Sequence, residues 1–179
     1  VLVFGAREMA DAPQVFDALA EAFGQSVVVG CSTSGEIAGP LVNDASLSVA
    51  VAQFEHTRLK MAVTDIAHAE ESGAAGRHLA EQLLAAGTDL QAVFMLSDGL
   101  CVNGTPLVAA LAGGLPAGVS ITGGLAGDGS RFERTWVLAG QRLAAGQVAA
   151  IGFYGSRLRV GSGAQGGWMD FGPERRITK

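Results

Sequence analysis

The pattern of apolar and polar positions along the chain predicts a protein built from both strands and helices. Short, uninterrupted apolar runs are typical of buried strands. Such runs occupy residues 1–4 (VLVF), 27–30 (VVVG), 92–96 (AVFML) and 119–122 (VSIT). Longer segments with apolar residues every three or four positions predict helices. These segments span residues 11–24, 70–86 and 103–115.

Residues that favour helix ends support two of these helices. In the first, Asp11 can cap the amino end, Pro13 fits the first turn and Gly24 ends the helix. In the third, we expect Thr105 to be the cap and Pro106 to occupy the first helical position.

Alternating segments predict further, half-buried strands. Residues 45–54 (ASLSVAVAQF) alternate, and 58–66 (RLKMAVTDI) are expected to form their antiparallel neighbour. Residues 131–140, 147–155 and 156–164 predict a strand meander. The expected fold class is therefore α/β, with mixed, largely antiparallel β-sheet layers flanked by helices.

The order of elements repeats at a shift of 92 positions, without gaps from the first strand to the loop that follows the second. Under this shift buried positions meet buried positions, and each loop ends in glycine and a carboxylate. The matched pairs are Val15 and Leu107, Leu19 and Leu111, Phe23 and Leu115, Val27 and Val119, Gly35 and Gly127, Glu36 and Asp128. We therefore expect a single domain over 1–179 with pseudo-repeated halves, about 1–66 and 92–165, separated by the helix 70–86. The two loops would then lie at equivalent ends, with one pocket between them.

Composition excludes several classes of protein. Of 179 residues, 49% are hydrophobic and 16% charged, which suits a packed domain rather than a disordered chain. The net charge is −5 without a Lys/Arg cluster, so neither nucleic acid nor an anionic membrane is an expected partner. The uncharged stretch 100–127 is interrupted by prolines and glycines, which favours a buried helix and strand over a membrane span.

The two cysteines are too few for a disulfide scaffold and indicate reduced thiols in a cytoplasmic protein. No signal peptide is expected, and the missing initial Met suggests a fragment of a longer chain.

Two loops of small residues, GCSTSGE (30–36) and GGLAGDG (123–129), are the main candidates for chemistry. Small residues at the end of a buried strand let a ligand approach the backbone. A phosphate-binding loop, however, leads into a helix whose amino end holds the anion. Both loops are expected to lead into strands instead, and neither GxGxxG nor GK[ST] occurs, so nucleotide binding is not expected.

The polar residues of these loops each have a structural and a functional interpretation. Cys31 is a buried thiol or, with a distant histidine, a nucleophile; the absence of a following helix favours burial. The hydroxyls of Ser32 and Thr33 satisfy a turn or bind a small polar ligand. Glu36 and Asp128 accept backbone N–H bonds or receive a cationic group of a ligand.

Other candidate residues are assigned structural roles. Asp98 and Asn103 follow a predicted strand, where they are expected to form a turn and cap a helix. His56, His68 and His78 form no metal-binding motif, although any one of them could serve as a single axial haem ligand. No metal site is predicted.

Several phrases together resemble the FIST N-terminal domain. They are VVVGCSTSGEIAG, SLSVAVAQF, MLSDGLCVNGTPLVAAL, ITGGLAGDGSRFERTWVLAG and VAAIGFYGSRLRVGSGAQGGWMDFGPERRITK. The resemblance covers nearly the whole chain in the right order. It implies a sensory module of bacterial or archaeal signalling, alone or beside a histidine kinase, cyclase or chemoreceptor output in cis or in trans. It also implies a small-molecule ligand, with amino acids the usual suggestion, and some similar proteins are described as haem-binding nitric oxide sensors. The family usually continues into a C-terminal FIST domain that this chain lacks.

The resulting prediction is a non-enzymatic, cytoplasmic sensory domain without a cofactor. Alternatives are a haem-binding nitric oxide sensor and a Cys31-dependent acyl- or amide-transfer enzyme. The expected ligand-binding residues are the motif positions of the two loops. They are Cys31, Ser32, Thr33, Gly35, Glu36, Gly123, Gly124, Gly127 and Asp128.

Overall fold

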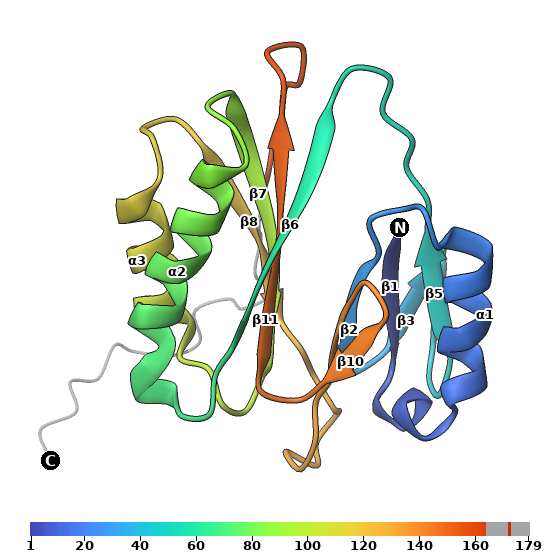
Figure 1. Cartoon of the computed structure of the whole chain (residues 1–179). Coiled ribbons are helices and arrows are strands. Elements are labelled where there is room, and N and C mark those ends of the chain that lie inside the picture. The colour runs from blue at the N-terminus through green and yellow to red at the C-terminus, as the bar shows by residue number, and fades with distance from the viewer. Residues whose placement is uncertain (164–171, 173–179) are drawn as a thin grey trace, which may run out of the picture.

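The chain folds into a four-layer sandwich in which two β-sheets pack face to face between helices (Figure 1). A computed structural model describes residues 1–163 and 172. Helix α1 covers the outer face of one sheet, and helices α2 and α3 cover the outer face of the other. Most strand pairs are antiparallel, which confirms the mixed, largely antiparallel α/β class.

The first sheet contains five strands in the order β10-β9-β2-β1-β5. Its elements are β1 (Leu2–Ala6), α1 (Pro13–Phe23), β2 (Val29–Thr33), β5 (Leu47–Ala50), β9 (Val137–Ala139) and β10 (Arg142–Ala144). Strands β1 and β2 are parallel and joined through α1, whereas β5 and β9 run antiparallel to them. Residues 7–11 form a 3₁₀ helix, η1, and a small hairpin of β3 (Glu36–Ala38) and β4 (Leu41–Asn43) follows β2.

The second sheet contains four strands in the order β6-β11-β7-β8. Its elements are β6 (Arg58–Asp65), η2 (Ala69–Glu71), α2 (Ser72–Ala85), β7 (Leu90–Ser97), α3 (Gly104–Gly114), β8 (Ser120–Leu125) and β11 (Gln147–Tyr154). Strands β7 and β8 are parallel and joined through α3. The molecule thus contains two parallel β–α–β units, one in each sheet; a duplication that produced them stays a prediction.

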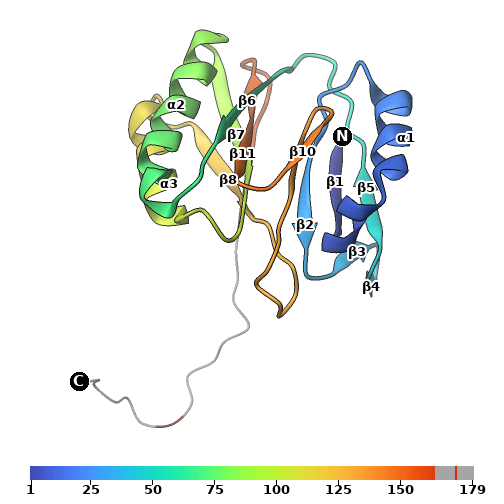
Figure 2. The same ribbon diagram turned by 60° about the horizontal axis from the view of Figure 1, so that its bottom comes forward.

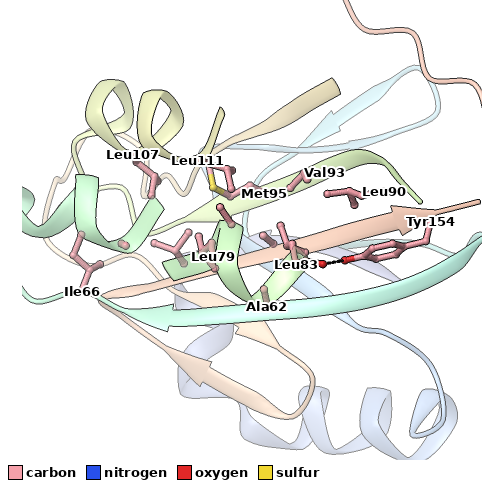
Figure 3. Close-up of a cluster of buried hydrophobic side chains, with 14 residues drawn as sticks. Ala62, Ile66, Leu79, Leu83, Leu90, Val93, Met95, Leu107, Leu111 and Tyr154 are labelled. Atoms are coloured by element: carbon pink, nitrogen blue, oxygen red, sulfur yellow. Dashed lines mark hydrogen bonds between the residues drawn. The ribbon is translucent and has the colours of Figure 1, made fainter. Parts of the chain in front are cut away.

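The outer core of the second sheet is built by leucines of α2 and α3. Leu79 and Leu111 are fully buried, and the Tyr154 hydroxyl donates a hydrogen bond to the Leu83 carbonyl at 2.7 Å (Figure 3). Gly76 lets the two helices approach closely, because a Cβ at this position would lie 2.3 Å from the Leu107 carbonyl oxygen. The small residues of α2 therefore set the helix spacing.

The inner core lies between the two sheets. Val29 and Val137 of the first sheet pack with Leu96 and Ile151 of the second. Cys31 belongs to this cluster and is 3% exposed. These side chains are apolar, apart from the weakly polar thiol of Cys31. The hydrophobic effect therefore stabilises the contact between the two sheets.

The predicted partner of residues 45–54 is wrong. Strand β5 pairs with β1 in the first sheet, while β6 pairs with β11 in the second. The seven residues between β5 and β6 cross from one sheet to the other (Figure 1). Alternation predicts a strand here but not its neighbour. It also does not mark the buried side chains, since Leu47 and Ser48 are half-buried whereas Val49 and Ala50 are exposed.

Of the meander predicted over 131–164, the strand at 147–155 is confirmed as β11, but the rest of the arrangement is wrong. Only residues 137–139 of the first segment form a strand, because the backbone N–H groups of Phe132, Glu133 and Arg134 bond to the Asp128 carboxylate. Residues 156–163 contain no strand, and position 164 lies outside the described residues. Strands β9 and β11 belong to different sheets.

Two helix caps differ from expectation. Asp11 makes no capping bond to α1 and instead pairs with Arg134. The residue at the N-cap position of α1 is Ala12. Helix α3 begins at Gly104, where the Asn103 side chain accepts the Thr105 N–H at 3.2 Å. The cap is therefore Asn103, as its structural interpretation predicts, and not Thr105.

Replacement of the fully buried Leu111 by alanine tests the outer core (Figure 3). We expect Leu111→Ala to lower the free energy of unfolding by about 2–5 kcal/mol, because it removes apolar contacts and leaves a cavity. The control is Val108→Ala on the same helix, where the side chain is 41% exposed. Chemical denaturation measures both, and similar losses for the two variants would contradict this account of the core.

Candidate functional site

The carboxyl ends of all four parallel strands meet at one edge of the sandwich. The Gly127 N–H, after β8, donates to the Ser32 carbonyl of β2 at 2.8 Å, and the Ala126 N–H donates to the Ser97 carbonyl of β7 at 2.8 Å. Strand β1 ends at Ala6, opposite Thr33 of β2. Figure 2 shows β2 and the chain between β8 and β9 approaching each other at this edge. Ligands of α/β proteins commonly bind at such an edge, so its side chains are candidates for a binding site.

The first loop is organised by the Glu36 carboxylate, which is 2% exposed. The Thr33 hydroxyl donates to it at 2.6 Å, and Ser46 donates through its hydroxyl at 2.8 Å and its backbone N–H at 3.1 Å. A buried carboxylate requires such partners, because an unpaired charge is costly to remove from water. Glu36 therefore joins the turn after β2 to the start of β5.

The second loop is organised by Asp128. Its carboxylate accepts the backbone N–H groups of Phe132, Glu133 and Arg134 at 2.7–3.1 Å. The bonds from Arg134 and Glu133 lower the pKa of Asp128. The Arg7 guanidinium lies 3.8 Å from the same carboxylate. Asp128 thus shapes the loop that would otherwise continue as a strand.

The two loops are joined directly. The Gly129 N–H donates to the Ser34 hydroxyl at 3.0 Å, and a Cβ on Gly127 would lie 2.7 Å from that oxygen. Behind this contact Ser32 is fully buried, and it exchanges backbone and side-chain hydrogen bonds with Trp136. Glycine at position 127 is required for this approach.

Between the loops lies a polar cavity of about 290 Å³. Its lining combines cationic, anionic and hydroxyl side chains from η1, the two loops and the turn between β4 and β5. The lining residues are Ala6, Arg7, Glu8, Thr33, Ser34, Gly35, Glu36, Asp44, Ala45, Asp128, Gly129, Ser130 and Arg131. We call this the polar cavity.

Ion pairs close one side of the polar cavity by tying η1 to the second loop. Arg7 bonds to Glu133 at 2.8 Å, Arg131 pairs with Glu8, and Arg134 pairs with Asp11. Exposed pairs of this kind contribute little to the stability of a fold, because water screens the charges. Their role here is to orient two arginines at the cavity rather than to stabilise the fold strongly.

The structure brings four of the nine predicted ligand-binding residues to the polar cavity: Thr33, Gly35, Glu36 and Asp128. Ser32 and Gly127 lie behind it, where they join the loops. Gly123 and Gly124 line a different cavity, between β8 and α3. Cys31 faces the inner core. These placements leave the ligand-binding role of the residues a prediction.

Sequence reasoning missed Arg7, Glu8, Asp44 and Arg131. A signal was present for the first pair, because the charged dipeptide at 7–8 directly follows an apolar run that predicts a strand. No comparable signal marks Asp44, which reaches the cavity only because β5 returns to pair with β1.

The Cys31 environment does not support nucleophilic chemistry. Burial raises the pKa of Cys31 to about 12, so the thiol is protonated at neutral pH. Burial, followed by the charge of Asp98, also raises the pKa of Cys101. Neither cysteine lines the polar cavity.

The three histidines lie outside the polar cavity. His68 caps η2, whereas the His56 and His78 side chains are 49% and 59% exposed beside Glu55 and Glu81. None of these histidines lines the second, largely apolar cavity, which lies between the two sheets near Val29 and Ile151. Within residues 1–163 no group of three His, Cys, Asp or Glu side chains could hold a metal ion. No described helix is both long and apolar enough to cross a membrane.

The fold and the polar cavity define the chain as an α/β sandwich domain with a charged recess at the ends of its parallel strands. Comparison with protein families matches the FIST N domain over residues 1–179, and the chain belongs to this family. FIST domains are sensory, signal-transduction domains, which confirms the resemblance carried by the loop motifs. Comparison with curated proteins returns no match. Residues 164–171 and 173–179, which belong to the last of the five phrases of that resemblance, lie outside the described residues.

Asp98 supports this whole edge from the end of β7. It is 1% exposed, and its carboxylate accepts bonds from the Leu100 and Cys101 N–H groups, the Thr135 hydroxyl and the Gly146 N–H. Burial alone would raise the pKa of Asp98, but these hydrogen bonds outweigh it and lower the pKa. Asp98 forms the predicted turn and also links the two sheets.

An Asp98→Asn variant tests this link through its pH dependence. Because the pKa is lower in the folded protein, ionised Asp98 stabilises the fold above its unfolded pKa of about 3.9 and loses this effect as the pH falls through the folded value. The variant should be less stable than the parent at pH 7, with a difference that shrinks below about pH 4. Urea denaturation at several pH values measures this. Asp17→Asn, an exposed position on α1, is the control; a difference independent of pH would contradict the role of the charge.

Proposed function

We propose that this domain is a cytoplasmic sensor that binds a small polar ligand, specifically an amino acid, in the polar cavity. The observation that carries the proposal is the meeting of both loops with Arg7 and Arg131 around one cavity at the strand ends. Such sites typically combine a few convergent polar groups with a preformed shape.

The charges in the polar cavity suit a zwitterion. Arg7 and Arg131 provide donors for an α-carboxylate, and guanidinium groups bind carboxylates in a matched, two-point geometry. Asp44 provides an acceptor for an α-ammonium group, and it enters no ion pair with the described residues. A ligand with both charges would satisfy both sides of the cavity.

The backbone beside Asp44 is held in an unusual conformation. Ala45 has a φ of 52°, in the left-handed region that costs a non-glycine residue about 1–3 kcal/mol. Residues held in this way concentrate at ligand sites, where surrounding structure maintains them. Here the Ser46 bonds to Glu36 maintain the turn. This observation supports a preorganised binding site.

Signal output would pass through the second loop. Arg7 and Arg131 connect the polar cavity to Glu133 and Glu8, so a carboxylate that engages these arginines competes with the ion pairs between η1 and the loop. We propose that the resulting change is passed to a histidine kinase, cyclase or chemoreceptor-type module in cis or in trans. Membership of a signal-transduction family supports this step. The buried, protonated Cys31 supports a binding role rather than an enzymatic one.

A panel of the twenty amino acids, tested by thermal shift and calorimetry, examines the proposal. At a concentration of 100 Kd a specific ligand should raise the stability by about 2.7 kcal/mol. For a domain of this size that corresponds to an increase in Tm of about 5–10 °C. No response to any amino acid, measured on the full-length protein, would contradict an amino-acid ligand.

Variants then locate the binding site. Arg7→Met removes a charged donor and should weaken the binding of the amino acid about 10- to 100-fold, since a charged hydrogen bond is worth about 1.5–3 kcal/mol. Asp44→Asn should also weaken it, by loss of the ammonium partner. Arg77→Met, at an exposed position on α2, is the matched control and should have no effect. Unchanged affinity in both cavity variants would place the site elsewhere.

A further inference from the structure

A second cavity lies between the two sheets, at the opposite end of β1 and β2 from the polar cavity. Its volume is about 260 Å³. Val29 contributes from the first sheet, and Ala92 and Ile151 contribute from the second. All three side chains are at most 3% exposed, so the cavity extends into the inner core. We call it the apolar cavity.

The lining of the apolar cavity is almost entirely hydrocarbon. Of its described side chains, the Thr122 hydroxyl is the single polar group, and no charged side chain is present. An ion or zwitterion entering it would lose its hydration without gaining partners, which is strongly unfavourable. The polar ligand proposed above is therefore unsuited to this cavity, and an uncharged molecule is suited to it.

Aromatic side chains contribute to the walls and the mouth of the apolar cavity. Phe54 packs edge to face against Phe153, with ring centroids 5.8 Å apart and an interplanar angle of 77°. Phe54 and Val160 remain 39% exposed, so apolar side chains also form the entrance. The inner walls are carried by strands of both sheets.

The volume sets the size of the occupant. A dry apolar cavity of about 150 Å³ holds benzene. The apolar cavity is larger and is matched by a bicyclic aromatic molecule or a hydrocarbon of similar bulk. It is too small for a helix, whose diameter with side chains is about 10–12 Å.

We propose that the apolar cavity is a second ligand site, which binds a small, uncharged and largely hydrocarbon molecule of bicyclic size. The site is independent of the polar cavity. It lies between the sheets rather than at the carboxyl ends of the strands, and it shares no lining residue with the polar cavity. The domain would thus receive two chemically different ligands.

Calorimetry with indole tests the proposal, and indole-3-carboxylate provides a ligand of the same ring system with a charge. We expect saturable binding of indole and at least tenfold weaker binding of the carboxylate, because the cavity offers no partner for the charge. No saturable binding of indole, or equal affinity for the two molecules, would overturn the proposal.

Two variants assign indole to the apolar cavity. Ala92→Leu fills its buried wall, and Ala52→Phe narrows it at an exposed lining position where folding is not at risk. Each should weaken indole binding at least tenfold, while Ala50→Phe, exposed and outside the lining, should leave it unchanged. If Ala92→Leu fails to fold, Ala52→Phe decides the result alone. Indole binding that survives in Ala52→Phe would overturn the assignment.

Discussion

The packing of the two sheets against each other is the constraint on which the rest of this structure depends. Val29 and Val137 of one sheet meet Leu96 and Ile151 of the other. This packing brings the ends of β2 and β8 close enough for the Gly127 N–H to bond to the Ser32 carbonyl. The two small-residue loops come from different sheets, so without this contact they would have no cavity in common.

The buried carboxylates at this edge of the sandwich mainly hold loops and strands together through hydrogen bonds. Glu36, Asp98 and Asp128 are each held by hydroxyl or backbone N–H donors, as the cost of a buried charge demands. Their accepting capacity is largely used within the protein. The groups proposed to receive a ligand are other residues of the same lining. Asp44 enters no ion pair with the described residues, and Arg7 would exchange its pairs with Glu133 and Glu8 for the ligand. The pair of acidic residues in the matching loops of this domain thus serves loop architecture.

The sandwich offers two environments because its two ends differ. At the carboxyl ends of the parallel strands, loops carry charged and hydroxyl side chains, and their backbone groups require polar partners. At the other end the inner faces of the sheets line the recess, and inner faces carry apolar side chains. The same architecture therefore produces a charged cavity and a hydrocarbon cavity in one domain. FIST membership describes the domain as sensory, and we propose these two cavities as places where it receives a chemical signal.

The local pattern of the sequence was sufficient to predict strands β1, β2, β7 and β8, helices α1, α2 and α3, the α/β class and the family, because periodicity and short motifs are properties of neighbouring residues. The predicted burial of residues 119–122 is wrong, because β8 lies at the edge of its sheet and is half-buried to exposed. The local pattern also identified Thr33, Gly35, Glu36 and Asp128 at the polar cavity, since small residues after a buried strand indicate a loop at a sheet edge. The local pattern could not predict strand partners, because β5 and β6 follow one another in the chain yet belong to different sheets. It also could not predict that Arg7 and Asp44 line the polar cavity, or that Gly123 and Gly124 line a different cavity. Those positions are decided by which strands pair and which faces pack, and both depend on contacts between residues far apart in the chain.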